Sequence, residues 1–120
     1  MKRILVLDDN EDILFVMQLL LEEEGYEVKC IYNPSEFMPL MLEFKPNLVI
    51  LDIQLGTQDG RALCELLQHL EDTKEIPILM MSAKTNITVM GGYSCKAEEL
   101  ISKPFDIEQM ARTIAYHLNK

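Results

Sequence analysis

Charged and hydroxyl side chains follow four of the segments that read as buried β-strands. Asp8 and Asp9 end the first aliphatic run, Asp52 ends the third, Ser82 ends the fourth, and Lys103 follows the fifth. The carboxyl ends of parallel strands share one edge of a sheet, so these side chains are expected to meet there. Three clustered carboxylates repel one another unless a cation lies among them, and an incomplete set of oxygen ligands suits Mg²⁺. The sequence therefore predicts a Mg²⁺ site.

Asp52 is the candidate nucleophile of this predicted site. With Mg²⁺ on one side and Lys103 on the other, its carboxylate could attack an activated phosphorus atom and form an aspartyl phosphate. Each residue alone has a simpler structural interpretation. The acid pair could favour a helix N-terminus, Asp52 could form a turn, Ser82 could be a strand-end hydroxyl, and Lys103 could be a solvated loop lysine. Their joint occurrence at successive strand ends favours the site.

The segments around these residues alternate regularly between predicted strand and predicted helix. Aliphatic or β-branched runs predict five strands, at residues 3–8, 26–31, 47–52, 76–82 and 99–102. Helical periodicity predicts helices between them, including a short, weakly patterned one at 84–96 and a last one that Asp106 caps. Alternation with short connections requires right-handed crossovers and parallel strands. The prediction is an α/β fold with a five-stranded parallel sheet and five helices on both faces.

The helix faces expected to meet the core are read from apolar residues at helical spacing. The first helix has such a stripe at Ile13, Val16, Met17, Leu20 and Leu21. The helix after residue 60 and the last helix have theirs at Leu63, Leu66, Leu67 and Leu70, and at Ile107, Met110, Ala111, Ile114 and Leu118. Both histidines, His69 and His117, fall late in helices and are expected at the surface.

Length and composition narrow the class of protein. The 120 residues, 48% of them hydrophobic, are expected to form one domain over residues 1–120. A formal net charge of −9 argues against direct nucleic-acid binding. No apolar run approaches the length of a membrane span and no signal peptide is evident, so a cytoplasmic location is expected. Cys30, Cys64 and Cys95 lack metal-ligand spacing and are expected to be reduced thiols.

Five short motifs together resemble the CheY-like receiver domain of two-component response regulators. They are Val6-Leu7-Asp8-Asp9-Asn10, Leu51-Asp52, Asp59-Gly60, Ser82-Ala83 and Lys103-Pro104-Phe105, and the resemblance covers the whole chain. It implies the flavodoxin-like, doubly wound form of the predicted fold. It also implies that Asp8, Asp9, Asp52 and the backbone carbonyl of Gln54 hold Mg²⁺, and that Asp52 accepts a phosphoryl group from a phosphohistidine. Ser82 and Lys103 would bind the phosphoryl oxygens, and the Lys103–Pro104 peptide bond would be cis.

The same resemblance implies a signalling switch, which catalyses its own phosphorylation and dephosphorylation at Asp52 and then binds an output partner. The expected phosphoryl donor is a sensor histidine kinase or a histidine phosphotransfer protein. Three positions depart from the family's pattern. Leu100 stands where an aromatic residue usually reports phosphorylation, Gly56 where proline is frequent, and Lys96 where glycine is usual. These departures concern the output, since every position of the predicted chemistry is kept.

Two apolar residues of the first helix, Leu14 and Phe15, lie off its predicted core stripe and are candidates for docking the phosphoryl donor. The alternative is that a broad apolar face buries them. A different function is a phosphorylation-independent binding module that uses residues 84–96 as its contact surface. A hydrolase or flavin protein is disfavoured, because Asp8-Asp9-Asn10 lacks the Asp-x-Asp spacing of haloacid dehalogenase-type phosphatases. No glycine-rich phosphate loop follows the first strand either.

Overall fold

The computed structural model describes residues 1–83 and 95–119, and its centre is a sheet of five parallel strands. The strands lie in the order β2-β1-β3-β6-β7. Their bounds are Arg3–Leu7 for β1, Glu27–Ile31 for β2, Leu48–Asp52 for β3, Ile78–Ser82 for β6 and Glu99–Ser102 for β7. Every neighbouring pair is parallel, which confirms the predicted doubly wound sheet.

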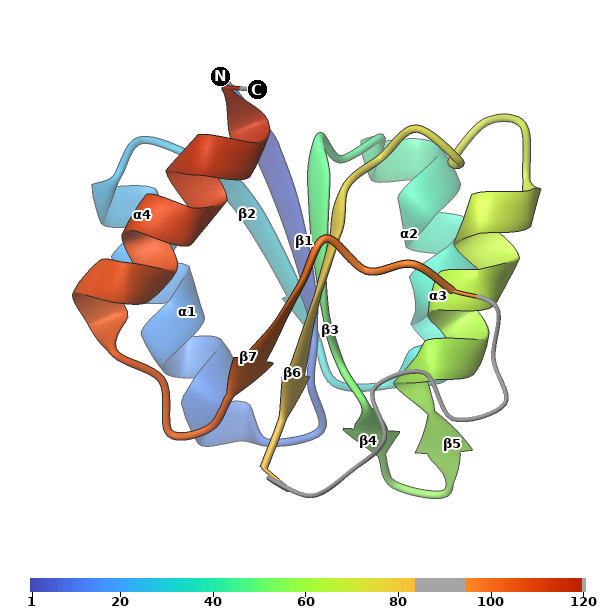
Figure 1. The fold of residues 1–120 in the computed structure, drawn as a ribbon, viewed down its shortest axis with the longest axis horizontal. Helices are drawn as coiled ribbons and strands as arrows, with labels where there is room; N and C mark the ends of the chain where they lie inside the picture. The colour runs from blue at the N-terminus through green and yellow to red at the C-terminus, as the bar shows by residue number, and fades with distance from the viewer. Residues whose placement is uncertain (84–94, 120) are drawn as a thin grey trace.

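Helices cover both faces of this sheet (Figure 1). Helices α1 (Glu11–Glu23) and α4 (Ile107–Leu118) pack on one face, and α2 (Phe37–Phe44) and α3 (Gly60–His69) pack on the other. A 3₁₀ turn over Pro34–Glu36, η1, leads into α2. The described residues thus contain four α-helices. The fifth predicted helix, at 84–96, falls almost entirely outside the described part of the chain.

The sheet has an apolar core on each side, and two of its inner strands are buried throughout. Every residue of β3 and β6 is buried, as expected of strands that helices cover on both faces.

Helices begin close to the carboxyl ends of the strands because polar side chains cap them there. Asn10 accepts hydrogen bonds from the amides of Asp12 and Ile13, and Asp106 accepts one from the amide of Gln109. The predicted cap at Asp106 is confirmed.

The predicted helix faces are only partly correct. In α1 the buried residues are Leu14, Met17 and Leu21, whereas Val16 is 37% exposed. Almost every residue from 13 to 21 is apolar, so periodicity alone does not define which face turns inward. In α3 the fully buried residues are Gly60, Cys64 and Leu67, while Leu66 and Leu70, two members of the expected stripe, are exposed.

His117 is buried, so the expectation that it lies at the surface is wrong. Its ring nitrogen Nε2 lies 2.6 Å from Oε2 of Glu99, which joins the last turn of α4 to β7. The pairing brings together residues 18 positions apart in the sequence, and helical position alone does not reveal it. His69 is exposed, as expected.

The cysteines also differ from the expectation of three reduced thiols. Cys64 of α3 and Cys95, which precedes β7, form a disulfide with their Cα atoms 5.6 Å apart. Both residues are buried in the core on the α2–α3 side of the sheet. Their separation of 31 residues concealed the pairing, because packing of the fold brings them together. Cys30 is free, and burial, with the nearby Glu22, raises the pKa of its thiol to about 12.

The disulfide predicts a specific alkylation pattern. Iodoacetamide applied to the denatured, unreduced protein is expected to modify Cys30 alone, whereas prior reduction should expose three thiols. Reduction is also expected to lower the free energy of unfolding by about 3 kcal/mol, because the bond closes a loop of some thirty residues. Intact mass and denaturant unfolding measure the two effects. Modification of three cysteines without reductant would contradict the pairing.

Candidate functional site

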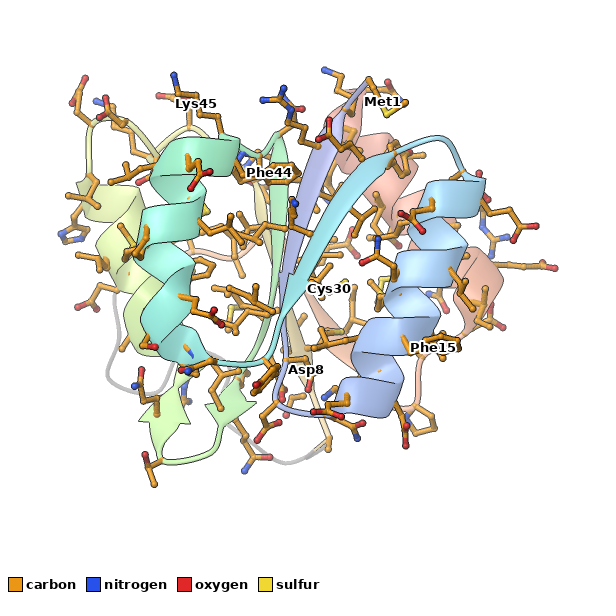
Figure 2. All side chains as sticks on the ribbon, turned by 180° about the vertical axis from the view of Figure 1, so that it is seen from behind. Met1, Asp8, Phe15, Cys30, Phe44 and Lys45 are labelled. Atoms are coloured by element: carbon orange, nitrogen blue, oxygen red, sulfur yellow. A yellow bond between two sulfur atoms is a disulfide. The ribbon has the colours of Figure 1, made fainter. Side chains whose placement is uncertain are left out.

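The predicted carboxylates gather at the carboxyl ends of β1 and β3. Asp8 directly follows β1 and is fully buried, and Asp52 is the last residue of β3 and is 4% exposed. The two strands pair in parallel with Leu7 opposite Leu51, so these acids are neighbours across the sheet. Asp9 is exposed, yet one oxygen from each of the three carboxylates lies within 4.8 Å of the others. Figure 2 shows Asp8 at this end of the sheet.

Lys103, which directly follows the edge strand β7, also lies beside these carboxylates. Its Nζ lies 2.7 Å from Oδ2 of Asp8 and 3.3 Å from Oδ2 of Asp52. Burial lowers the pKa of Lys103, but the two carboxylates outweigh that effect and leave the pKa raised. The backbone amide of Lys103 donates to the carbonyl of Ser82, and the Lys103–Pro104 bond is cis, as predicted. The two ion pairs hold the ammonium group between Asp8 and Asp52.

Ser82 lies at the same edge, on the strand between Asp52 and Lys103. It is the last residue of β6 and is 1% exposed. In the register of the sheet Met81 pairs with Asp52, and Ser82 pairs with Ser102. All five side chains predicted from the sequence thus lie at one edge of the sheet, at or just after the ends of four different strands. Their chemical roles remain predictions.

The acidic cluster has the donor set expected of a divalent-cation site. Oδ1 of Asp8 accepts a hydrogen bond of 2.9 Å from the amide of Asn10. Apart from the contact with Lys103, Oδ2 of Asp8 has no hydrogen-bond donor among the described residues although it is buried. Three carboxylates this close together repel one another unless a cation lies among them, and Mg²⁺ prefers oxygen ligands. The residues present therefore fit Mg²⁺.

The environment of Asp52 disfavours its ionised form when no metal is bound. Burial, followed by the charge of Asp8, raises the pKa of Asp52 from 3.8 to about 6. Lys103 and a backbone hydrogen bond from Gln54 act in the opposite direction but are weaker. Burial and a neighbouring like charge both oppose a second negative charge, and a shift of this kind is common in sites that do chemistry.

This shift predicts how stability depends on pH in metal-free buffer. Between pH values of about 4 and 6 the folded chain binds more protons at Asp52 than the unfolded chain, so the free energy of unfolding falls as the pH rises. The full effect is on the order of 2–3 kcal/mol. Asp52→Asn is therefore expected to be more stable than the unmodified protein at pH 7.5, with the difference vanishing near pH 4. Urea unfolding measures this, and a difference independent of pH would contradict it.

Two glycines support the site in ways that the sequence alone did not show. A Cβ on Gly60 would overlap the backbone carbonyl oxygen of Asp52, so helix α3 can begin against β3 only with glycine there. Gly56 donates its amide to Asp9 across 3.0 Å. The motif Asp59-Gly60 is the sequence signal that points to Gly60. Residues 54–59, which lie between β3 and α3, form a hairpin of β4 (Gln54–Leu55) and β5 (Gln58–Asp59).

The fold and site define a doubly wound α/β domain with an acidic, lysine-bridged cluster at the carboxyl edge of its sheet. The chain belongs to the response regulator receiver domains, since the model of that family matches residues 4–115. It is therefore a receiver domain of the two-component signalling type. None of the helices that the structure describes is long and apolar enough to cross a membrane.

Similar proteins place this assignment in context. The DNA-binding dual master transcriptional regulator RpaA of Synechocystis is 34% identical over 111 residues, which are 92% of this chain and 46% of that protein. The chain thus spans about half the length of this relative. A putative response regulator from Chloroflexus aurantiacus has a TM-score of 0.90 at 27% identity, with 99% of this chain and 98% of that chain covered.

A third similar structure shares the fold and contains a metal. It is the receiver domain of the sensor histidine kinase PA1611 from Pseudomonas aeruginosa, with a magnesium ion coordinated in its active site cleft. Its TM-score is 0.88 at 18% identity, with 99% of this chain and 98% of that chain covered. At this identity the likeness concerns the fold alone.

Proposed function

We propose that residues 1–120 form a single receiver domain in which Asp52 accepts a phosphoryl group from the phosphohistidine of a kinase or phosphotransfer protein. The observation that carries the proposal is the buried ion-pair cluster, in which the Nζ atom of Lys103 lies 2.7 Å from Asp8 and 3.3 Å from Asp52. A cation placed between two carboxylates at the end of a parallel sheet can stabilise negative charge that develops on a transferred phosphoryl group.

The proposed Mg²⁺ ligands are the carboxylates of Asp8, Asp9 and Asp52 and the backbone carbonyl of Gln54. The closeness of the three carboxylates and the fold shared with a Mg²⁺-containing receiver domain support this choice. When bound, Mg²⁺ would offset the negative charge of the acids and of the incoming phosphoryl oxygens.

In the proposed transfer, an oxygen of Asp52 forms a bond to phosphorus while the bond from phosphorus to the histidine nitrogen of the donor breaks. The electron pair of that bond stays on the imidazole, which takes up a proton as it leaves. Lys103 pairs with the phosphoryl oxygens, and the hydroxyl of Ser82 donates a hydrogen bond to one of them. Attack of water on the acyl phosphate later restores the carboxylate. Catalysis of both steps is mainly positioning and electrostatic stabilisation.

The proposed partners are a sensor histidine kinase or histidine phosphotransfer protein and a separate output protein or domain in the cytoplasm. RpaA binds DNA, but a net charge of −9 on this chain opposes direct contact with a phosphate backbone. We therefore assign any DNA binding to a partner or to another domain.

Leu100, at the position where the family has an aromatic residue, is partly buried against the core on the α2–α3 side.

A small phosphodonor tests this function without a protein partner. The protein is incubated with phosphoramidate, with and without Mg²⁺, and its intact mass is followed beside that of Asp52→Asn. A gain of one phosphoryl group that requires both Mg²⁺ and Asp52 is expected. No gain in a correctly folded protein would reject the proposal and favour a phosphorylation-independent binding module.

Phe15 is the proposed docking residue for the phosphoryl donor. Its side chain is 65% exposed on the outer face of α1 (Figure 2), whereas Leu14, the other candidate, is only 7% exposed and belongs to the core. Phe15→Ser is therefore expected to slow phosphotransfer from a protein donor about tenfold, the loss of roughly 1.4 kcal/mol, while the rate with phosphoramidate is unchanged. Leu42→Ser, which changes a leucine of α2 that is 55% exposed, is the control. Equal slowing with both donors would contradict the assignment.

A further inference from the structure

Asp9 differs from the other two acids of the cluster in how it is held. Asp8 and Asp52 are buried and both contact Lys103. Asp9 is exposed, and its Oδ2 accepts a hydrogen bond of 3.0 Å from the amide of Gly56, a residue 47 positions further along the chain. An exposed aspartate without such a contact would sample several rotamers. The Gly56 amide thus fixes the one acid of the cluster that burial does not fix.

The hairpin that carries Gly56 is itself anchored to the core. β4 and β5 pair with Leu55 opposite Gln58, which leaves Gly56 and Thr57 as a two-residue turn. Leu55 is 2% exposed and packs in the core on the α2–α3 side, so the turn is held beside the carboxyl end of β3 (Figure 1). The amide therefore approaches Asp9 from a fixed support.

Backbone conformation explains why glycine occupies position 56. Its φ of 62° lies in the left-handed region that glycine adopts most easily, and such angles are typical of two-residue hairpin turns. A Cβ there would meet nothing within 4 Å, so space is not the constraint. Proline, the residue frequent here in the family, has neither this φ nor an N–H to donate. Gly56 supplies both.

We propose that the amide of Gly56 is a positioning group for the Mg²⁺ site, acting through Asp9. The proposal rests on the proposed function, since it assumes that Asp8, Asp9 and Asp52 bind Mg²⁺. With one oxygen of Asp9 held by the hairpin, the carboxylate keeps an oxygen within 4.8 Å of the ligand atoms of the other two acids. Groups that orient metal ligands in this way contribute substantially to metal affinity.

An amide-to-ester replacement removes this hydrogen bond without adding a side chain. Glycolic acid at position 56 leaves an ester oxygen in place of the N–H, and the full chain can be assembled by ligating residues 1–63 to residues 64–120 at Cys64. Titration calorimetry with MgCl₂ is expected to show about tenfold weaker binding than for the unmodified chain. A chain with D-alanine at position 56, which keeps the N–H and favours positive φ, should bind like the unmodified one.

The same ester in an Asp9→Ala background separates positioning from a general effect on the hairpin. The ester should cause no further loss of Mg²⁺ affinity there, because its effect is transmitted through Asp9. Equal affinity of the ester and unmodified chains, or an undiminished loss in the Asp9→Ala background, would overturn the inference and leave the proposed function intact. Absence of Mg²⁺ binding by the unmodified chain would overturn the proposed function and this inference with it.

Discussion

Lys103→Met is expected to lower the free energy of unfolding by about 3 kcal/mol at pH 7 in metal-free buffer, because removal of one member of a buried ion-pair cluster leaves uncompensated charge. Asp8 and Asp52 are both buried and both contact this ammonium group. Methionine keeps most of the volume of the side chain, so the charge is the main change. Denaturant unfolding monitored by circular dichroism measures the loss. The same variant should accept phosphoryl from phosphoramidate far more slowly.

Two controls identify electrostatics as the cause. Asp52→Asn removes one of the two carboxylates, so the cost of Lys103→Met should be much smaller in that background. Addition of Mg²⁺ should also recover part of the stability, since a ligand that binds only the folded chain stabilises it. If Lys103→Met cost the same in both backgrounds and at every Mg²⁺ concentration, the account of this cluster would be wrong.

Gly60→Ala is expected to destabilise the protein by about 3 kcal/mol, at the upper end of what overpacking costs. The added Cβ would overlap the backbone carbonyl oxygen of Asp52 and would also lie 3.3 Å from the Cα of Ile53. Neither is the end of a flexible side chain, so the start of α3 or the end of β3 must move. Because that movement displaces Asp52, phosphorylation by phosphoramidate should slow as well. Thermal unfolding and intact mass measure the two effects.

Gly25→Ala is the matched control for this substitution. Gly25 has a φ of 92°, but a Cβ there meets nothing within 4 Å. Its cost is therefore conformational only, roughly 1–2 kcal/mol, and phosphorylation should be unaffected. If the two variants were equally stable and equally active, the close approach of Gly60 to Asp52 would have no importance for the site.

The sheet and the edge that carries the site could be predicted because their signals are local. Each strand is a continuous aliphatic run, and parallel pairing then places Asp8, Asp52 and Ser82 together without further information. The same rule places Lys103 at this edge, because Lys103 directly follows the fifth strand. Every one of these residues lies at the predicted edge.

What could not be predicted depends on packing between distant segments. Helical periodicity does not define the inward face of α1, because nearly all of its central residues are apolar, and Leu14 is buried there although it lies off the predicted stripe. The pairing of His117 with Glu99 and the bond between Cys64 and Cys95 connect elements whose contact follows from the assembled fold. The hydrogen bond from Gly56 to Asp9 depends on the geometry of the β4–β5 hairpin, which the sequence analysis does not predict.

Locating the phosphoryl group tests most directly whether Asp52 is the phosphoacceptor. The protein is phosphorylated with phosphoramidate and Mg²⁺, treated with borohydride, which reduces an acyl phosphate to an alcohol, and mapped by tandem mass spectrometry. Homoserine is expected at position 52, with aspartate unchanged at positions 8 and 9. Reduction at another residue, or none after a confirmed gain of mass, would contradict the claim that Asp52 is the phosphoacceptor.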